Sequence, residues 1–84
     1  MSQMMPKKNM KTLAQTPAGK TVIVSRLDSH PETCHRLREL GFCENALIRC
    51  VTNGAAQLIC EVCNTRVGLN YSVAQAIFVT PIEN

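Results

Sequence analysis

Turn-forming residues divide this chain into short segments, and this division constrains its fold more than any other feature of the sequence. In most segments apolar residues alternate with polar ones, which is the pattern of a strand with one buried face. Only residues 31 to 40 have the spacing of a helix longer than one turn. The sequence therefore predicts a mainly β architecture, with strands at residues 20 to 27, 46 to 52, 57 to 62, 66 to 70 and 76 to 80.

The predicted helix has recognisable signals at both ends. Ser29 or His30 precedes Pro31, whose fixed φ angle suits the first turn of a helix. At the other end, Gly41 tolerates the left-handed conformation with which many helices terminate. We expect the helix to run from Pro31 to about Leu40.

Two short turns connect the later strands. Asn53-Gly54 is a favoured hairpin turn, Asn64-Thr65 turns the chain again, and residues 71 to 75 form a single helical turn. The last strand can then pair with the first. These elements predict a small five-stranded SH3-like barrel with one inserted α-helix and a short helical turn before the last strand. The expected core comprises Val22, Val24, Leu37, Leu40, Phe42, Ile48, Leu58, Val62, Val67, Leu69, Ala74, Ile77 and Val79.

The length of 84 residues allows one domain with a compact core, since a chain this small buries only about 60% of its unfolded surface. Residues 1–11 mix methionine, proline and lysine without periodicity, which predicts a flexible basic tail. Residues 12–84 form the predicted barrel domain.

The charge is concentrated in that tail. The formal net charge is +3, and Lys7, Lys8 and Lys11 account for all of it, because the remaining residues carry six basic and six acidic side chains. A neutral domain with one tyrosine, two phenylalanines and no tryptophan offers little to a phosphate backbone or to stacked bases. A small RNA- or DNA-binding barrel is therefore the weakest of the functional alternatives, and no nucleic-acid partner is expected.

Five cysteines, an odd number, argue against a complete disulfide framework. The N-terminal residues lack the apolar core of a signal peptide, and every apolar stretch is far shorter than the ~20 residues that cross a bilayer. The sequence predicts reduced thiols in a cytoplasmic protein.

Two pairs of residues could contribute metal ligands. Cys60 and Cys63 have the spacing of a zinc knuckle or a redox motif, but within a strand these positions face opposite sides and lie ~10 Å apart. Cys34 and His35 are consecutive on the helix, so their side chains diverge by about 100°. We expect packed thiols and no cofactor, and keep a metal-binding or metal-sensing module for Fe²⁺ or Zn²⁺ as the alternative.

No signature of catalysis is present. The chain has no glycine-rich phosphate loop and no nucleophile with a plausible histidine partner, and Asp28 is its only aspartate. Four arginines at positions 36, 38, 49 and 66 could form a basic patch, although nearby glutamates favour a solvated face of mixed charge. The sequence predicts a binding module and not an enzyme.

Several motifs resemble the FeoA family, the small cytosolic accessory proteins of bacterial ferrous iron uptake. Leu40-Gly41-Phe42 matches the end of the family's leucine-rich helix, and Asn45 stands where the family has a turn glycine. Residues 69 to 74, LNYSVA, followed by Ile77-Phe78-Val79, resemble its helical turn and closing strand. The resemblance covers roughly residues 13 to 82. The hairpin loop at residues 52 to 56 is shorter than in the family, and Ala18 is an extra residue.

The resemblance implies a function in ferrous iron uptake. It predicts a protein that binds or regulates the cytoplasmic GTPase region of a FeoB-type membrane transporter, that reaches the membrane only through this partner and that does not itself carry iron. Leu40, Gly41 and Phe42, with Arg36 and Arg38, are the predicted partner-binding residues. For the side chains of Leu40 and Phe42, packing in the core is the favoured interpretation. The same fold also occurs as the C-terminal domain of iron-dependent repressors.

Overall fold

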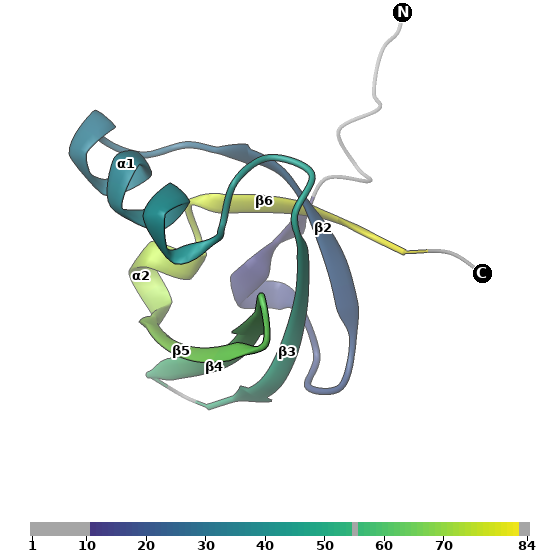
Figure 1. Ribbon diagram of the computed structural model, residues 1–84. Helices are drawn as coiled ribbons and strands as arrows, with labels where there is room; N and C mark the ends of the chain where they lie inside the picture. The colour runs from purple at the N-terminus through teal and green to yellow at the C-terminus, as the bar shows by residue number, and fades with distance from the viewer. Residues whose placement is uncertain (1–10, 55, 83–84) are drawn as a thin grey trace, which may run out of the picture.

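A computed structural model describes residues 11–54 and 56–82 of the chain (Figure 1). Six antiparallel strands form one curved sheet in the order β1-β6-β2-β3-β4-β5. Among the described residues, no helix is long and apolar enough to cross a membrane. The elements in chain order are β1 (Lys11–Thr12), a 3-10 helix (Leu13–Gln15), β2 (Thr21–Leu27), α1 (Pro31–Leu40), β3 (Leu47–Asn53), β4 (Gln57–Val62), β5 (Thr65–Asn70), α2 (Tyr71–Ala74) and β6 (Ile77–Pro81).

The mainly β, SH3-like architecture is confirmed, with a different number of strands. As predicted, the last strand pairs with the first long one, with Val24 opposite Val79 in the β2–β6 ladder. The sixth strand is β1, in which Lys11 and Thr12 pair with β6. Two residues are too few to show an alternating pattern, so the sequence placed Lys11 in the tail. The rest of the predicted tail lies outside the described residues.

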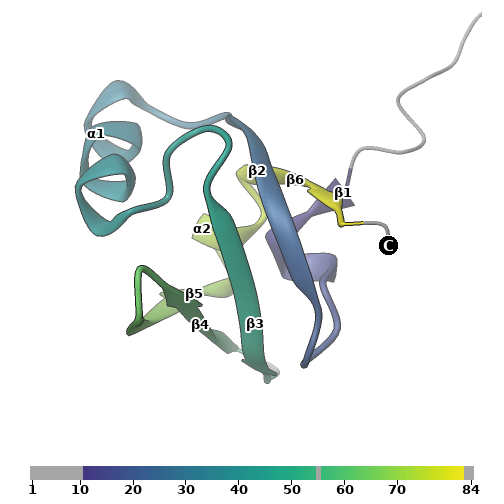
Figure 2. The same ribbon diagram turned by 45° about the vertical axis from the view of Figure 1, so that its right-hand side comes forward.

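Two irregularities bend the sheet around its core. The register shifts between Val24 and Arg26 where β2 pairs with β6, and between Cys50 and Thr52 where β3 pairs with β4. Bulges of this kind increase the local twist and allow a small sheet to curve. Figure 2 shows the result, with β2 and β3 side by side, β4 and β5 turning away beneath them, and α1 at one end of the sheet.

Helix α1 has the predicted bounds and ends in a Schellman motif. Gly41 has a φ of 108°, and its N–H donates to the carbonyl of Arg38 at 3.1 Å. The N–H of Phe42 donates to the carbonyl of Leu37 at 2.9 Å. The reversal of direction at Gly41 carries Phe42 into the core, where its side chain is fully buried.

The predicted turn residues have mixed outcomes. Asn45, which stands where the family has a turn glycine, and Asn64, in the predicted second turn, both adopt the left-handed conformation, with φ of 74° and 63°. The prediction that Asn53 forms the hairpin turn is wrong, because Asn53 is the last residue of β3. Its amide donates to the carbonyls of Ala14 and Thr16 at 3.1 and 2.8 Å, and these bonds tie β3 to the segment before β2.

Most of the predicted core is confirmed, with two exceptions. Leu40 is 43% exposed because it is the last residue of α1 and projects beyond the core. Val67 is half-buried and packs against the edge of the core. The buried apolar residues that the predicted core did not include are Leu13, Ala14, Cys34, Cys50 and Cys60.

Phe42 provides a test of this core. Phe42→Ala should lower the free energy of unfolding by about 3–5 kcal/mol, because a buried ring is replaced by a cavity. Urea unfolding followed by circular dichroism would measure this loss, which is large against the stability of a small domain. Leu47, which is 57% exposed, supplies the control, since Leu47→Ala should change stability by no more than about 0.5 kcal/mol. Equal effects of the two substitutions would contradict the assignment of Phe42 to the core.

Candidate functional site

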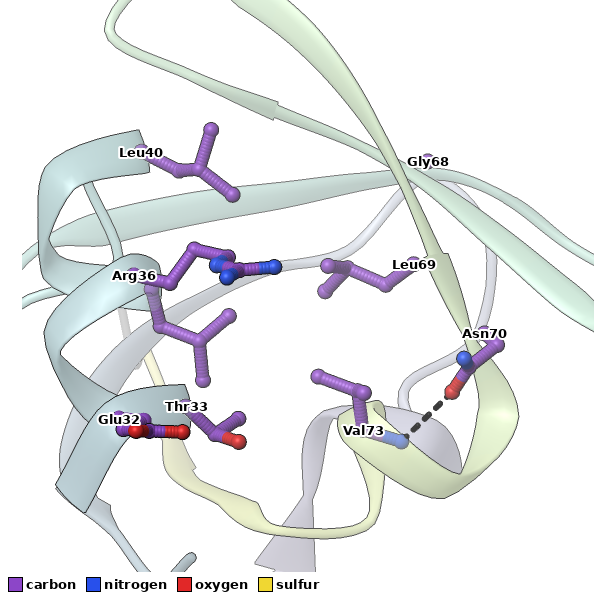
Figure 3. A pocket seen from close by; sticks show the side chains of 9 residues that line it. Glu32, Thr33, Arg36, Leu40, Gly68, Leu69, Asn70 and Val73 are labelled. Carbon is purple, nitrogen blue, oxygen red and sulfur yellow. Dashed lines mark hydrogen bonds between the residues drawn. The ribbon is translucent and has the colours of Figure 1, made fainter. Parts of the chain in front are cut away.

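A groove of about 530 Å³ separates α1 from β5 and α2 (Figure 3). Five residues of α1 form one wall, and residues of β5 and α2 form the other. A volume of this size is within the range of protein ligand sites. The residues that line the groove are Glu32, Thr33, Arg36, Leu37, Leu40, Gly68, Leu69, Asn70 and Val73.

The wall contributed by α1 follows from helical spacing. Arg36 and Leu37 follow Thr33 by three and four residues, and Leu40 follows them by four and three, so all four lie along one face of the helix. Figure 3 shows Leu40 and Arg36 extending from this face into the groove, toward the opposite wall. Leu37 is buried at the base of α1, whereas Leu40 leaves apolar surface exposed.

The opposite wall depends on a cap at the start of α2. The side chain of Asn70 accepts a hydrogen bond from the N–H of Val73 at 2.9 Å, which satisfies one of the free donors of the first turn. This bond fixes the short helix at the end of β5 and places Val73 beside Leu69 at the groove (Figure 3). The groove therefore has apolar side chains on both walls.

The structure brings together two of the five predicted partner-binding residues. Leu40 and Arg36 both line the groove, whereas Phe42 is buried in the core and its side chain presents no surface. Gly41 packs closely on Val62, whose Cγ2 atom would lie 3.0 Å from a Cβ at position 41. Gly41 ends the helix and does not line the groove, whereas Leu40 and Leu37 before it do.

Arg38, the fifth predicted residue, lies outside the groove lining. Its guanidinium forms an ion pair with Glu44 at 3.0 Å. The hydrogen bond between these side chains raises the pKa of Arg38 and lowers the pKa of Glu44. Arg49 similarly pairs with Glu61 at 3.6 Å, so these arginines belong to a surface of mixed charge.

The cysteines of the CxxC pair occupy different environments. Cys60 is fully buried in β4, whereas Cys63 is exposed in the following turn with a φ of 53°. Burial, together with the nearby thiol of Cys50, raises the pKa of Cys60 to about 12. Cys50, directly opposite Cys60 on β3, is also buried, although the predicted core contained no cysteine. Buried thiols with a raised pKa are poor metal ligands and nucleophiles.

Cys34 and His35 are likewise separated. The thiol of Cys34 is buried and donates to the carbonyl of Ser29 at 3.5 Å. His35 projects into solvent, where its Nε2 atom lies 3.2 Å from a carboxylate oxygen of Glu39. Within residues 11–54 and 56–82, no group of three or more histidine, cysteine, aspartate or glutamate side chains is arranged to hold a metal ion.

The structure thus has the architecture of a small SH3-like barrel with an open, partly apolar groove. Comparison with known proteins gives its family: the FeoA domain profile matches residues 11–81, so this chain belongs to the FeoA family. Membership of this family implies involvement in ferrous iron transport. A search of curated protein sequences finds no significant match.

Solved structures share the fold at low sequence identity. The chain is similar to the crystal structure of an iron uptake regulatory protein, FeoA, with a TM-score of 0.82 and 18% identity over 87% of this chain and 99% of the other. A FeoA-like protein from Clostridium acetobutylicum gives 0.79 and 13%, over 90% and 91% of the two chains. A manganese-dependent transcriptional repressor gives 0.80 and 21%, over 87% of this chain and 41% of the repressor. The same barrel thus also occurs as part of a longer protein.

Thiol reactivity tests the placement of the five cysteines. In the native protein at pH 8, Cys43 and Cys63 should react rapidly with 5,5′-dithiobis(2-nitrobenzoic acid), because both are exposed. Cys34, Cys50 and Cys60 should react only when the protein unfolds. Stopped-flow absorbance counts the fast thiols, and Cys63→Ser should remove one of them while Cys60→Ser removes none. Rapid native labelling of Cys60 would contradict its burial.

Proposed function

We propose that this protein is a cytoplasmic accessory factor of ferrous iron uptake that docks, through the groove between α1 and β5, onto the cytoplasmic GTPase region of a FeoB-type membrane transporter. Membership of the FeoA family supports a function in ferrous iron uptake. The groove supports docking as the way in which the protein acts. The protein contributes a binding surface, and the transporter carries the ion and hydrolyses the nucleotide.

The exposed apolar end of α1 is the observation on which this proposal depends. Leu40 is a large aliphatic residue that is 43% exposed, and it projects into a groove whose other wall presents Leu69 and Val73. Burying such surface against a partner would contribute about 25 cal/mol for each Å² removed from water. Arg36, beside Leu40, adds a charged group at the same place, and arginine is enriched at protein interfaces.

A docking function also fits the cysteine chemistry better than the metal-binding alternative does. Cys60 and Cys34 are buried, and Cys60 and Cys63 lie in different environments. Converting these residues into ligands would require the core to open, whereas the groove is accessible without rearrangement. The regulation of a transporter through contacts is therefore the function that this geometry supports best.

Isothermal titration calorimetry with the isolated GTPase domain of the cognate transporter tests the proposal, with and without nucleotide and Fe²⁺. The wild-type protein should bind saturably. Leu40→Asp should weaken binding by about tenfold or more, because it places a carboxylate in an apolar contact. Leu47→Asp is the matched control, since Leu47 is exposed but does not line the groove.

The outcomes separate the location of the site from the identity of the partner. Equal weakening by both aspartate variants would contradict docking at the groove. Absence of binding by the wild-type protein in every nucleotide state would contradict the GTPase domain as the partner. Comparison of the nucleotide states shows which form of the GTPase the protein selects.

A further inference from the structure

Strand β5 is an edge of the sheet, since among residues 11–54 and 56–82 it pairs with β4 and with no other strand. An edge strand presents backbone N–H and C=O groups that lack partners within the sheet. On the open side of β5 the next element is α1, and the groove described above lies between them (Figure 3). The groove therefore combines side chains with an unpaired strand edge.

The register identifies which backbone groups are free. Val62 and Thr65 face each other across a two-residue turn in which both Cys63 and Asn64 have positive φ. This geometry is that of a type I′ hairpin, whose flanking residues form a hydrogen-bonded pair. Because hydrogen-bonded and non-hydrogen-bonded pairs alternate along an antiparallel ladder, Arg66 and Gly68 direct their N–H and C=O groups away from β4.

The free edge of β5 reaches the groove at Gly68. Gly68 lines the groove although it has no side chain, so the surface that it presents there is backbone. Outside the ladder with β4, the described residues supply no backbone partner to Arg66 or Gly68. An incoming strand would meet donors and acceptors at these two positions, which are separated by one residue, as the alternation of a β ladder requires.

The charge of Arg36 indicates which kind of incoming strand would fit the groove. Arg36 lines the groove and forms no ion pair with any of the described residues. Among the described residues that line the groove, Glu32 is the only acidic one, and it lies one helical turn before Arg36, in the first turn of α1. There the N-terminal end of the helix dipole favours its negative charge. A carboxylate placed opposite Arg36 would therefore gain an ion pair that the free protein lacks.

We propose that the groove binds an extended, acidic segment of the partner protein, which adds as a strand to the free edge of β5. Backbone hydrogen bonds to Arg66 and Gly68 hold the segment, an apolar side chain packs against Leu40 and Val73, and a carboxylate pairs with Arg36. This mode of recognition, strand addition beside a helix, derives affinity from the backbone and specificity from the side chains. The inference rests on the proposed docking function of the same groove, and defines the chemistry of the docked segment.

Nuclear magnetic resonance with a synthetic probe tests the inference without the transporter. The probe is a six-residue peptide of valine and threonine with one central glutamate, capped at both ends. At millimolar concentration it should shift the amide resonances of Arg66 and Gly68 of the full chain and slow their exchange with solvent. The same peptide with lysine in place of glutamate should bind about fivefold more weakly, and a peptide methylated at alternate backbone nitrogens should not bind.

Variants of the protein separate the backbone contribution from the side-chain contribution. Gly68→Pro removes the outward N–H, and an edge strand tolerates proline at such a position. Gly68→Ala retains the N–H. In both variants Cβ would come 2.9 Å from Nε2 of Gln57, the mobile end of a side chain. Proline also fixes φ and places its Cδ where the N–H was, so the methylated peptide provides the independent test of the backbone contribution. Peptide binding should survive in the alanine variant and be lost in the proline variant. Arg36→Glu should abolish the preference for glutamate over lysine, and Arg38→Glu should preserve it.

The results distinguish this inference from the proposed function. Absence of amide shifts in β5, equal binding of the glutamate and lysine peptides, or undiminished binding of the methylated peptide would overturn strand addition. If the proline variant does not fold, the methylated peptide still provides the backbone test. Peptide binding at β5 together with no binding of the GTPase domain would support this inference and contradict the proposed partner. Docking that requires Leu40, with no peptide effect at β5, would contradict this inference alone.

Discussion

The left-handed turn at Gly41 is the constraint on which both the core and the groove depend. Two hydrogen bonds close the end of α1 there, and the chain reverses so that Phe42 enters the core while Leu40 remains outside. A side chain at position 41 would be strained by its φ of 108° and would crowd Val62 on β4. A single glycine thus determines which neighbouring apolar residue stabilises the fold and which is available to a partner.

Elements governed by local chemistry could be predicted from the sequence. The bounds of α1 follow from Pro31 and Gly41, and the left-handed residues Asn45 and Asn64 follow from the tolerance of a short amide for positive φ. The pairing of the last strand, β6, with the first long strand, β2, also follows from the length of the segments and from the need to bury their apolar faces. In each of these cases the signal lies within a few residues of the feature.

Features that depend on distant residues could not be predicted in this way. Asn53 has the local chemistry of a turn, but its amide satisfies two carbonyls almost forty positions away, and this tertiary contact holds it in β3. Leu13 is buried because the short 3-10 helix folds against the barrel. No alternation of apolar and polar residues in the sequence predicts this contact. The lining of the groove also divides into residues that local sequence predicts and residues that it does not. Leu40 and Arg36 could be predicted from their positions on the helix. Gly68, Leu69 and Val73 lie opposite them only because of the way the strands are ordered in the fold.

The proposed docking mode combines a free strand edge with the side chains of a helix, and these two parts respond differently to changes of sequence. Structures at 13–21% identity share this fold with TM-scores near 0.8, so the backbone is retained while most side chains change. Hydrogen bonds from an edge such as β5 depend on the backbone alone and survive such changes. In the proposed docking mode, selectivity comes from the side chains of the helix opposite, which in this chain are those of Arg36 and Leu40. Because the ends of both walls are fixed by the turn at Gly41 and the cap at Asn70, these side chains can vary without loss of the groove itself.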